Sequence, residues 1–89
     1  QTQKGVVFDE YGNAIENAYV INPTSETHSH TDPSGSFIIE KTKIGDVLRV
    51  IATGFKNKKY TVVDDESKIV LEDVVLKLND VVILLLQVN

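Results

Sequence analysis

The stretch at residues 31–37 constrains the fold more than any other part of the chain, because it places a tight turn between two β-prone segments. Asp32 and the proline after it favour the start of a β-turn, and Gly35 can adopt the positive φ that ends one. The polar segment 27–31 predicts a solvent-exposed strand, and the apolar residues within 36–40 predict a buried one. We therefore expect these two segments to form an antiparallel hairpin, with further strands on either side.

Short β-prone segments separated by turn residues continue along the rest of the chain. The other predicted strands are residues 5–8, 18–21, 47–52, 60–63, 69–71 and 74–78. No stretch shows a sustained helical period. About seven short strands, with turn residues about every ten positions, favour an all-β antiparallel sandwich. The largely apolar residues 47–52 predict a central strand that is covered on both faces.

Several residues have an expected role within this pattern. Large apolar residues in or beside the predicted strands should form the core: Phe37, Ile39, Val50 and Phe55. Glycines in the turn segments should provide backbone geometry through a positive φ: Gly12, Gly35 and Gly54.

Length limits the domain organisation. The 89 residues suffice for one small domain, which we place at residues 1–78, with residues 79–89 as a C-terminal strand or the start of a linker to a downstream domain. The longest apolar run, residues 81–86, is too short to span a bilayer and could instead pair with a second copy to form a homodimer. The chain starts at Gln1, as expected of an exported protein after removal of its signal peptide.

Charge and cysteine content argue against several functions. The net charge of −4 argues against nucleic-acid binding, which needs a basic surface. The chain has no cysteine, so neither a disulfide nor a thiolate metal site can form. We expect no cofactor, because the sequence lacks a glycine-rich phosphate-binding loop.

His28, His30 and Asp32 form the sharpest local pattern of candidate metal ligands. Side chains at every second position lie on one face of a strand, so two imidazoles and one carboxylate would face the same way. Such a set could bind zinc, with a fourth ligand from another strand or from water. The alternative is a solvated strand face on which Asp32 serves only the turn.

The sequence predicts a protein without catalytic activity. Its carboxylates at residues 9–10, 64–66 and 72–73 are adjacent, so on a strand their side chains would point to opposite faces rather than flank one substrate. The serines lack the nucleophile elbow G-x-S-x-G. The basic run at residues 56–59 predicts a solvated turn or a contact with a phosphate or an anionic glycan. A glycan site would need exposed aromatic rings, for which the candidates are Tyr11, Tyr19 and Tyr60.

Several motifs, in this order and at these spacings, resemble those of the carboxypeptidase regulatory-like domains. The matching segments are residues 5–15 (G-x-V-x-D-x-x-G-x-P-L), 18–20 (A-x-V), 31–37 (T-D-x-x-G-x-F), 45–48 (G-D-x-L) and 54–55 (G-F). Ala14 replaces the usual proline, and Ile15 stands in place of leucine. Residues 78–83 are similar to the L-D-E-V-V-V motif that often closes the domain, whereas the leucines at 84–86 depart from the small and polar residues expected there.

This resemblance implies a fold similar to transthyretin (prealbumin), a seven-stranded antiparallel Greek-key sandwich, and an accessory role without catalytic residues. A common setting of such domains is the periplasmic N-terminal extension of TonB-dependent outer-membrane receptors in Bacteroidetes. We therefore expect an exported protein of the periplasm or outer membrane with a protein partner in the periplasm or cell envelope. The alternatives are a stand-alone secreted glycan- or metal-binding module and a pilin-like sandwich with an isopeptide bond between Lys4 and Asn79.

Overall fold

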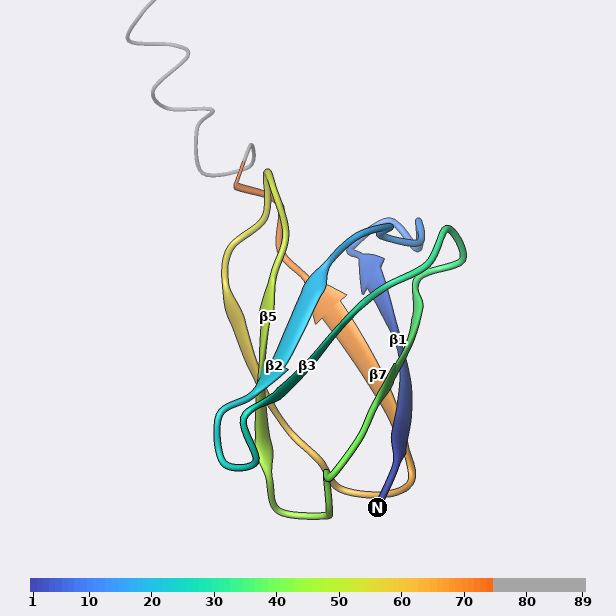
Figure 1. Cartoon of the computed structure of the whole chain (residues 1–89). Helices are drawn as coiled ribbons and strands as arrows, with labels where there is room; N and C mark the ends of the chain where they lie inside the picture. Colours follow the sequence, from blue (N-terminus) through green and yellow to red (C-terminus); the bar gives the residue numbers. More distant parts are fainter. Residues whose placement is uncertain (75–89) are drawn as a thin grey trace, which may run out of the picture.

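The chain folds into two packed β-sheets with seven strands in all, as a computed structural model that describes residues 1–74 shows (Figure 1). The strands are β1 (Gln3–Asp9), β2 (Tyr19–Asn22), β3 (Thr27–His30), β4 (Ser36–Ile39), β5 (Val47–Ile51), β6 (Lys58–Thr61) and β7 (Glu66–Leu71). One sheet has the order β4-β1-β7 and the other the order β3-β2-β5-β6. The all-β sandwich predicted from the strand pattern is confirmed. The suggested strand or linker at residues 79–89, its homodimer contact and Asn79 lie outside the described residues.

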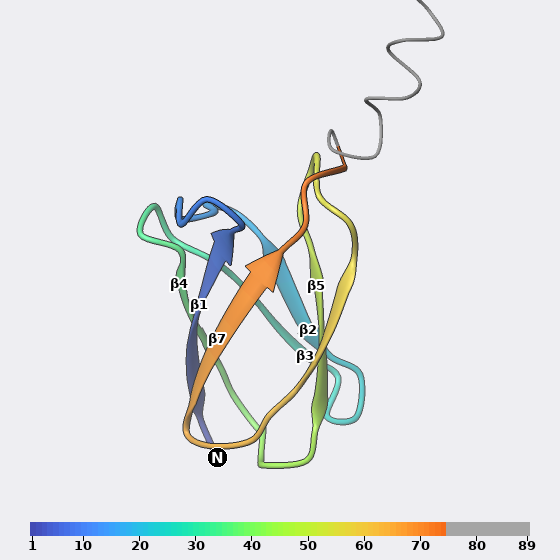
Figure 2. The same ribbon diagram turned by 180° about the vertical axis from the view of Figure 1, so that it is seen from behind.

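One strand pair runs parallel, which differs from the wholly antiparallel sandwich that the sequence predicts. β1 and β7 pair from Lys4 opposite Glu66 to Asp9 opposite Leu71. Figure 2 shows the arrows of these two strands pointing the same way. Parallel neighbours need a long crossover connection, and here the other five strands supply it. Within residues 1–74, no helix has the length and apolar content needed to cross a membrane.

The turn at residues 32–35 forms as predicted, but it connects two sheets rather than two paired strands. The amide of Gly35 donates to the carbonyl of Asp32 at 2.8 Å, and Gly35 has a φ of 81°. β3 pairs with β2, whereas β4 pairs with β1, so the expected hairpin over residues 27–40 is wrong. The turn is instead a corner of the sandwich, at the end opposite the N-terminus (Figure 1).

Hydrogen bonds to both sheets explain why the strands separate at this corner. The hydroxyl of Thr31 accepts from the amide of Ala18 at 2.8 Å and donates to the carbonyl of Ile15 at 2.6 Å, which holds the end of β3 against the start of β2. The carbonyl of Gly35 accepts from the amide of Val7 at 2.8 Å, which starts the pairing of β4 with β1. The corner therefore turns the chain from one sheet into the other.

Apolar side chains from both sheets meet between them and form one core. Its members are Val7, Ile15, Ala18, Val20, Phe37, Ile39, Leu48, Val50, Val62, Ile69 and Leu71. The core positions predicted at Phe37, Ile39 and Val50 are confirmed, whereas Phe55 is only partly buried and packs against the core.

β5 is central in its sheet, as predicted, but only one of its faces is covered. Leu48 and Val50 are fully buried, whereas Val47 and Ile51 are 40% and 41% exposed. The prediction of burial on both faces is wrong, because a two-layer sandwich covers each sheet on one side only.

Two glycines are required by the close approach of other atoms, and at one of them, Gly35, the positive φ requires a glycine as well. A Cβ at Gly5 would lie 2.3 Å from the ring of Phe37, so the absence of a side chain lets that ring pack over β1. A Cβ at Gly35 would lie 2.6 Å from the carbonyl oxygen of Val7. The expected positive φ angles are confirmed at Gly12, Gly35 and Gly54, at 85°, 81° and 86°.

Replacing Gly35 by alanine should destabilise the domain more than the same change at Gly12. Both positions have a similar positive φ, which costs an alanine about 1 kcal/mol. Only at Gly35 would the new methyl group also meet backbone, whereas no atom lies within 4 Å at Gly12. We expect Gly35→Ala to lower the free energy of unfolding by about 3 kcal/mol and Gly12→Ala by about 1 kcal/mol, measured by urea denaturation. Equal losses would contradict this account of the corner.

Candidate functional site

The two histidines of the predicted metal site lie on the exposed face of β3, beside a tyrosine from the neighbouring strand. The ring centre of Tyr19 is 5.5 Å from that of His28 and 4.8 Å from that of His30, and the two imidazole centres are 6.5 Å apart. The strand register causes this grouping, because Tyr19 lies directly opposite His30. The two-residue period of a strand predicted that His28 and His30 share one face. It could not place Tyr19 beside them, because that needs the register of β2 against β3.

Asp32 is engaged by its own turn. Its Oδ1 accepts hydrogen bonds from the amide of Ser34 at 3.0 Å, the hydroxyl of Ser34 at 2.7 Å and the amide of Ser36 at 2.9 Å. The hydroxyl of Ser34, followed by the amide of Ser36, lowers the pKa of Asp32 below its ordinary value. In the described part of the chain, no three or more histidine, cysteine or acidic side chains are grouped to hold a metal ion. Metal binding by His28, His30 and Asp32 stays a prediction.

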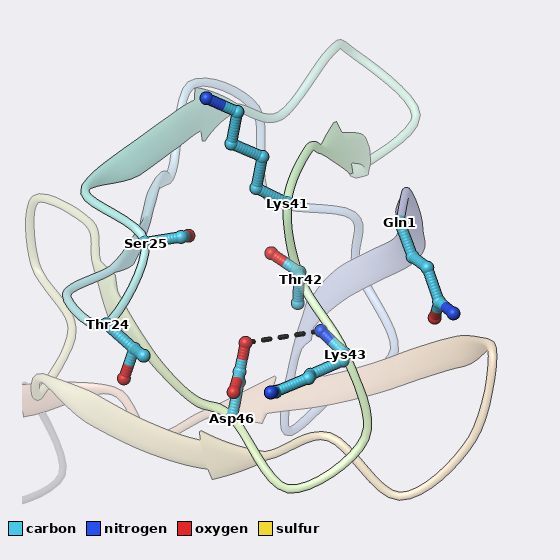
Figure 3. A pocket seen from close by; sticks show the side chains of 7 residues that line it. All are labelled: Gln1, Thr24, Ser25, Lys41, Thr42, Lys43 and Asp46. Carbon is cyan, nitrogen blue, oxygen red and sulfur yellow. Dashed lines mark hydrogen bonds between the residues drawn. The ribbon is translucent and has the colours of Figure 1, made fainter.

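A polar hollow of about 350 Å³ lies at the sandwich end that carries the N-terminus (Figure 3). It is lined by Gln1, Thr24, Ser25, Lys41, Thr42, Lys43 and Asp46. These residues come from the first residue of the chain, the loop between β2 and β3, and the loop between β4 and β5. Figure 3 shows the side chain of Lys43 beside Asp46, whereas Lys41 extends away from that carboxylate.

A buried hydrogen-bond network forms beneath this hollow. The amide nitrogen Nδ2 of Asn22, which is fully buried, donates to Oγ1 of Thr42 at 3.0 Å and to Oδ2 of Asp46 at 2.9 Å. The amide of Thr24 donates to Oδ1 of Asn22 at 3.1 Å, and the amide of Lys43 donates to Oδ2 of Asp46 at 3.2 Å. The network joins the end of β2 to the loop between β4 and β5, so these polar side chains hold the loops together.

The sequence indicated this network only in part. The Gly45-Asp46 pair predicted a turn, and Asn22-Pro23 predicted a strand end, but nothing local shows that the two segments meet. The pKa of Asp46 is lowered first by the hydrogen bond from the Asn22 side chain, then by the amide and the positive charge of Lys43, against an opposing effect of burial. Asp46 therefore stays ionised at neutral pH and serves as a hydrogen-bond acceptor rather than a proton donor.

The other candidate residues are distributed over separate parts of the surface. Asp64 and Asp65 are exposed in the loop between β6 and β7, and Oδ1 of Asp64 accepts from the amide of Glu66 at 3.1 Å. The basic run at residues 56–59 was predicted as a turn, but Lys58 and Lys59 belong to β6, and Lys56 forms an ion pair with Glu72 at 2.7 Å.

The three tyrosines considered for glycan binding are not grouped. Tyr11 is 67% exposed on the turn after β1, and Tyr60 is partly buried against the core. Tyr19 alone packs with other aromatic rings, and these are the two histidines of β3. The described tyrosines therefore do not form a shared platform.

Aliphatic side chains are exposed on the outer faces of both sheets. On the three-stranded sheet, Ile38 is 55% and Val70 is 47% exposed. On the four-stranded sheet, Val47 is 40% and Ile51 is 41% exposed. Sequence reasoning missed the second pair, because it assigned both faces of β5 to the interior.

Comparisons with known proteins identify a family and a similar fold. A family model described as a CarboxypepD_reg-like domain matches residues 3–83, which confirms the resemblance drawn from the sequence motifs. No curated protein matches the chain. One chain in the crystal structure of a type II cohesin–X-dockerin complex from Acetivibrio cellulolyticus, a C-terminal interface mutant, is similar with a TM-score of 0.64 and 15% identity. The similarity covers 80% of the present chain and 56% of that one, so the present chain corresponds to little more than half of that chain.

Asp46 should contribute stability that is lost in acid. Because its pKa is lowered on folding from an ordinary value of 3.8, its contribution is complete above that value and disappears as the pH falls through the folded pKa. We expect Asp46→Asn to reduce the decline of the unfolding free energy below about pH 4, measured by urea denaturation at successive pH values. Asp65→Asn, an exposed loop change, should leave that decline intact. Identical pH profiles for the two variants would contradict the role assigned to the network.

Proposed function

This chain belongs to the CarboxypepD_reg-like domain family, and on that basis we propose that it is a non-catalytic accessory domain that binds another protein. The observation that carries the proposal is the exposure of aliphatic side chains on regular, outward-facing strand positions of both sheets. Ile38 and Val70 lie on one outer face, and Val47 and Ile51 lie on the other. Contiguous exposed apolar surface marks sites of protein–protein interaction, and these outward-facing side chains are apolar groups that such a site would use.

The buried polar groups support a structural role for the interior. Within residues 1–74, every buried side-chain nitrogen or oxygen has a hydrogen-bond partner. Thr31 bonds to the backbone of Ile15 and Ala18, and Asn22 bonds to Thr42 and Asp46. These groups hold loops and strand ends in place, so binding is left to the outer surface.

The structural neighbour adds support from another protein. A chain of similar fold takes part in the cohesin–X-dockerin complex, which shows that a β-sandwich of this kind occurs within an assembly of proteins. At 15% identity the likeness concerns the fold, so the partner of the present chain has to be found by experiment.

More specifically, we propose that the domain belongs to an exported bacterial protein, a TonB-dependent outer-membrane receptor, and forms its periplasmic N-terminal extension. Two sequence features support this setting: the family motifs between residues 5 and 55, and residues 78–83, which are similar to the segment that often closes such a domain ahead of the plug. A reading frame that encodes no plug and barrel downstream of this chain would overturn the receptor assignment and leave the binding role in place.

Photocrosslinking in living cells tests the binding role. A photoreactive amino acid at Ile51 or at Val70 should crosslink to a defined protein of the cell envelope, because both side chains are exposed on sheet faces. The same amino acid at Asp65, in the loop between β6 and β7, is the control and should give no such product. Mass spectrometry identifies the crosslinked protein. Absence of a specific product from both face positions would contradict the proposal.

A further inference from the structure

The four-stranded sheet contains no acidic residue, although the chain as a whole is acidic. Its strands β2, β3, β5 and β6 include no aspartate or glutamate, whereas the chain has 13 acidic residues and a net charge of −4. The same strands carry three cationic side chains: Arg49, Lys58 and Lys59. The carboxylates of residues 1–74 therefore all lie outside these four strands.

The register of β5 against β6 places two of these cations together. Arg49 lies directly opposite Lys59, and both residues are exposed. Like charges directly opposite each other on neighbouring strands are destabilising. Within the described residues, the single ion pair joins Lys56 to Glu72, so neither cation of the opposed pair is neutralised there. An anionic group bound beside them would relieve this repulsion.

A hollow of about 320 Å³ lies at the same place. It is lined by Arg49, Ile51, Asn57, Lys58 and Lys59. Arg49 and Lys59, which are paired on the outward face, thus share this hollow with one aliphatic side chain, that of Ile51, which is 41% exposed. This combination suits an extended segment in which a carboxylate side chain and an apolar one are two positions apart and so share a face.

A row of aromatic and aliphatic side chains extends from the hollow across the sheet. Tyr19 lies opposite Ile51 on one side and opposite His30 on the other. Arg49 and Lys59 belong to the next outward-facing row, about 7 Å along the strands. A polypeptide segment lying on this face could therefore place apolar side chains on one row and acidic side chains on the next.

We propose that this basic face, defined by Tyr19, Arg49, Ile51 and Lys59, binds an acidic, extended segment of the partner protein. The inference rests on the proposed function and adds the surface and the chemistry of the partner. Charge complementarity favours an acidic occupant. The exposed Ile51 and the half-buried Tyr19 favour a polypeptide with apolar side chains. The net negative charge of the chain disfavours the approach of a long nucleic acid.

Fluorescence anisotropy with the labelled heptapeptide Glu-Ser-Leu-Ser-Glu-Ser-Leu, whose glutamate and leucine side chains share one face when the peptide is extended, tests the proposal. We expect the chain to bind this peptide, to bind it less tightly as salt is added, and to bind a control peptide with glutamine in place of glutamate much less tightly. The double variant Arg49→Gln/Lys59→Gln should weaken binding on the order of tenfold. NMR signals of residues 49, 51 and 59 should shift on titration.

A matched variant distinguishes the effect of the basic face on affinity from the effect of net charge. Lys4→Gln/Lys68→Gln removes two exposed lysines from the outer face of the three-stranded sheet and should leave the affinity within about twofold of the unmodified chain. Thermal unfolding of both double variants verifies that they are folded. Equal losses of affinity in the two variants, or equal binding of the glutamate and glutamine peptides, would overturn the proposal.

Other occupants give distinct results. Self-association that Arg49→Gln/Lys59→Gln abolishes would overturn the proposal in favour of a second copy of the chain, and tighter binding of an oligonucleotide of equal charge would overturn it in favour of nucleic acid. If the peptide does not bind but crosslinks form from Ile51 or Val70, the acidic partner is excluded and the proposed function stands. If the peptide binds and no crosslink forms, the basic face binds acidic peptides but the proposed function fails, which overturns the assignment of this face to a partner protein.

Discussion

The hydrogen bonds of Thr31 are the contact on which the two-layer arrangement depends. Its buried hydroxyl donates to the carbonyl of Ile15 and accepts from the amide of Ala18, so it ends β3 against the start of β2. Leaving such buried groups without partners would cost about 1–3 kcal/mol each. Four residues later, the backbone of Gly35 packs on Val7 and starts the pairing of β4 with β1. This short corner therefore determines which sheet each of the two strands joins.

The opposite end of the sandwich is closed by the same kind of interaction. Asn22, Thr42 and Asp46 join the end of β2 to the loop before β5 through buried hydrogen bonds. Burial of the aliphatic core drives the sheets together but has no preferred direction. The hydrogen bonds at the two ends fix how the sheets are oriented, because each hydrogen bond is favourable in only one geometry.

Two layers leave one face of each sheet in water, and the side chains there bear on function. Asp9 and Asp32 accept hydrogen bonds from the turns that they begin, so turn chemistry accounts for carboxylates at the ends of strands. It does not account for Arg49 opposite Lys59 in the middle of a sheet, or for exposed Ile51 beside them. Binding of a partner gives a physical reason for both features.

The sequence alone determined the properties that depend on neighbouring residues. The strand pattern, the positive φ of Gly35 and the shared face of His28 and His30 all follow from local backbone chemistry and from the period of a single strand. The sequence also contained the spaced motifs from which the family resemblance was drawn. Each of these features can be identified without knowing which strands are neighbours.

Only the tertiary structure decided how the strands combine. It separated β3 from β4, made β1 and β7 parallel, exposed one face of β5, and placed Tyr19 against the two histidines. It also brought Asn22 to Asp46, from segments more than twenty positions apart. These outcomes depend on pairing and register between strands that are distant in the chain, and no local preference of a residue specifies its partner across a sheet or a core.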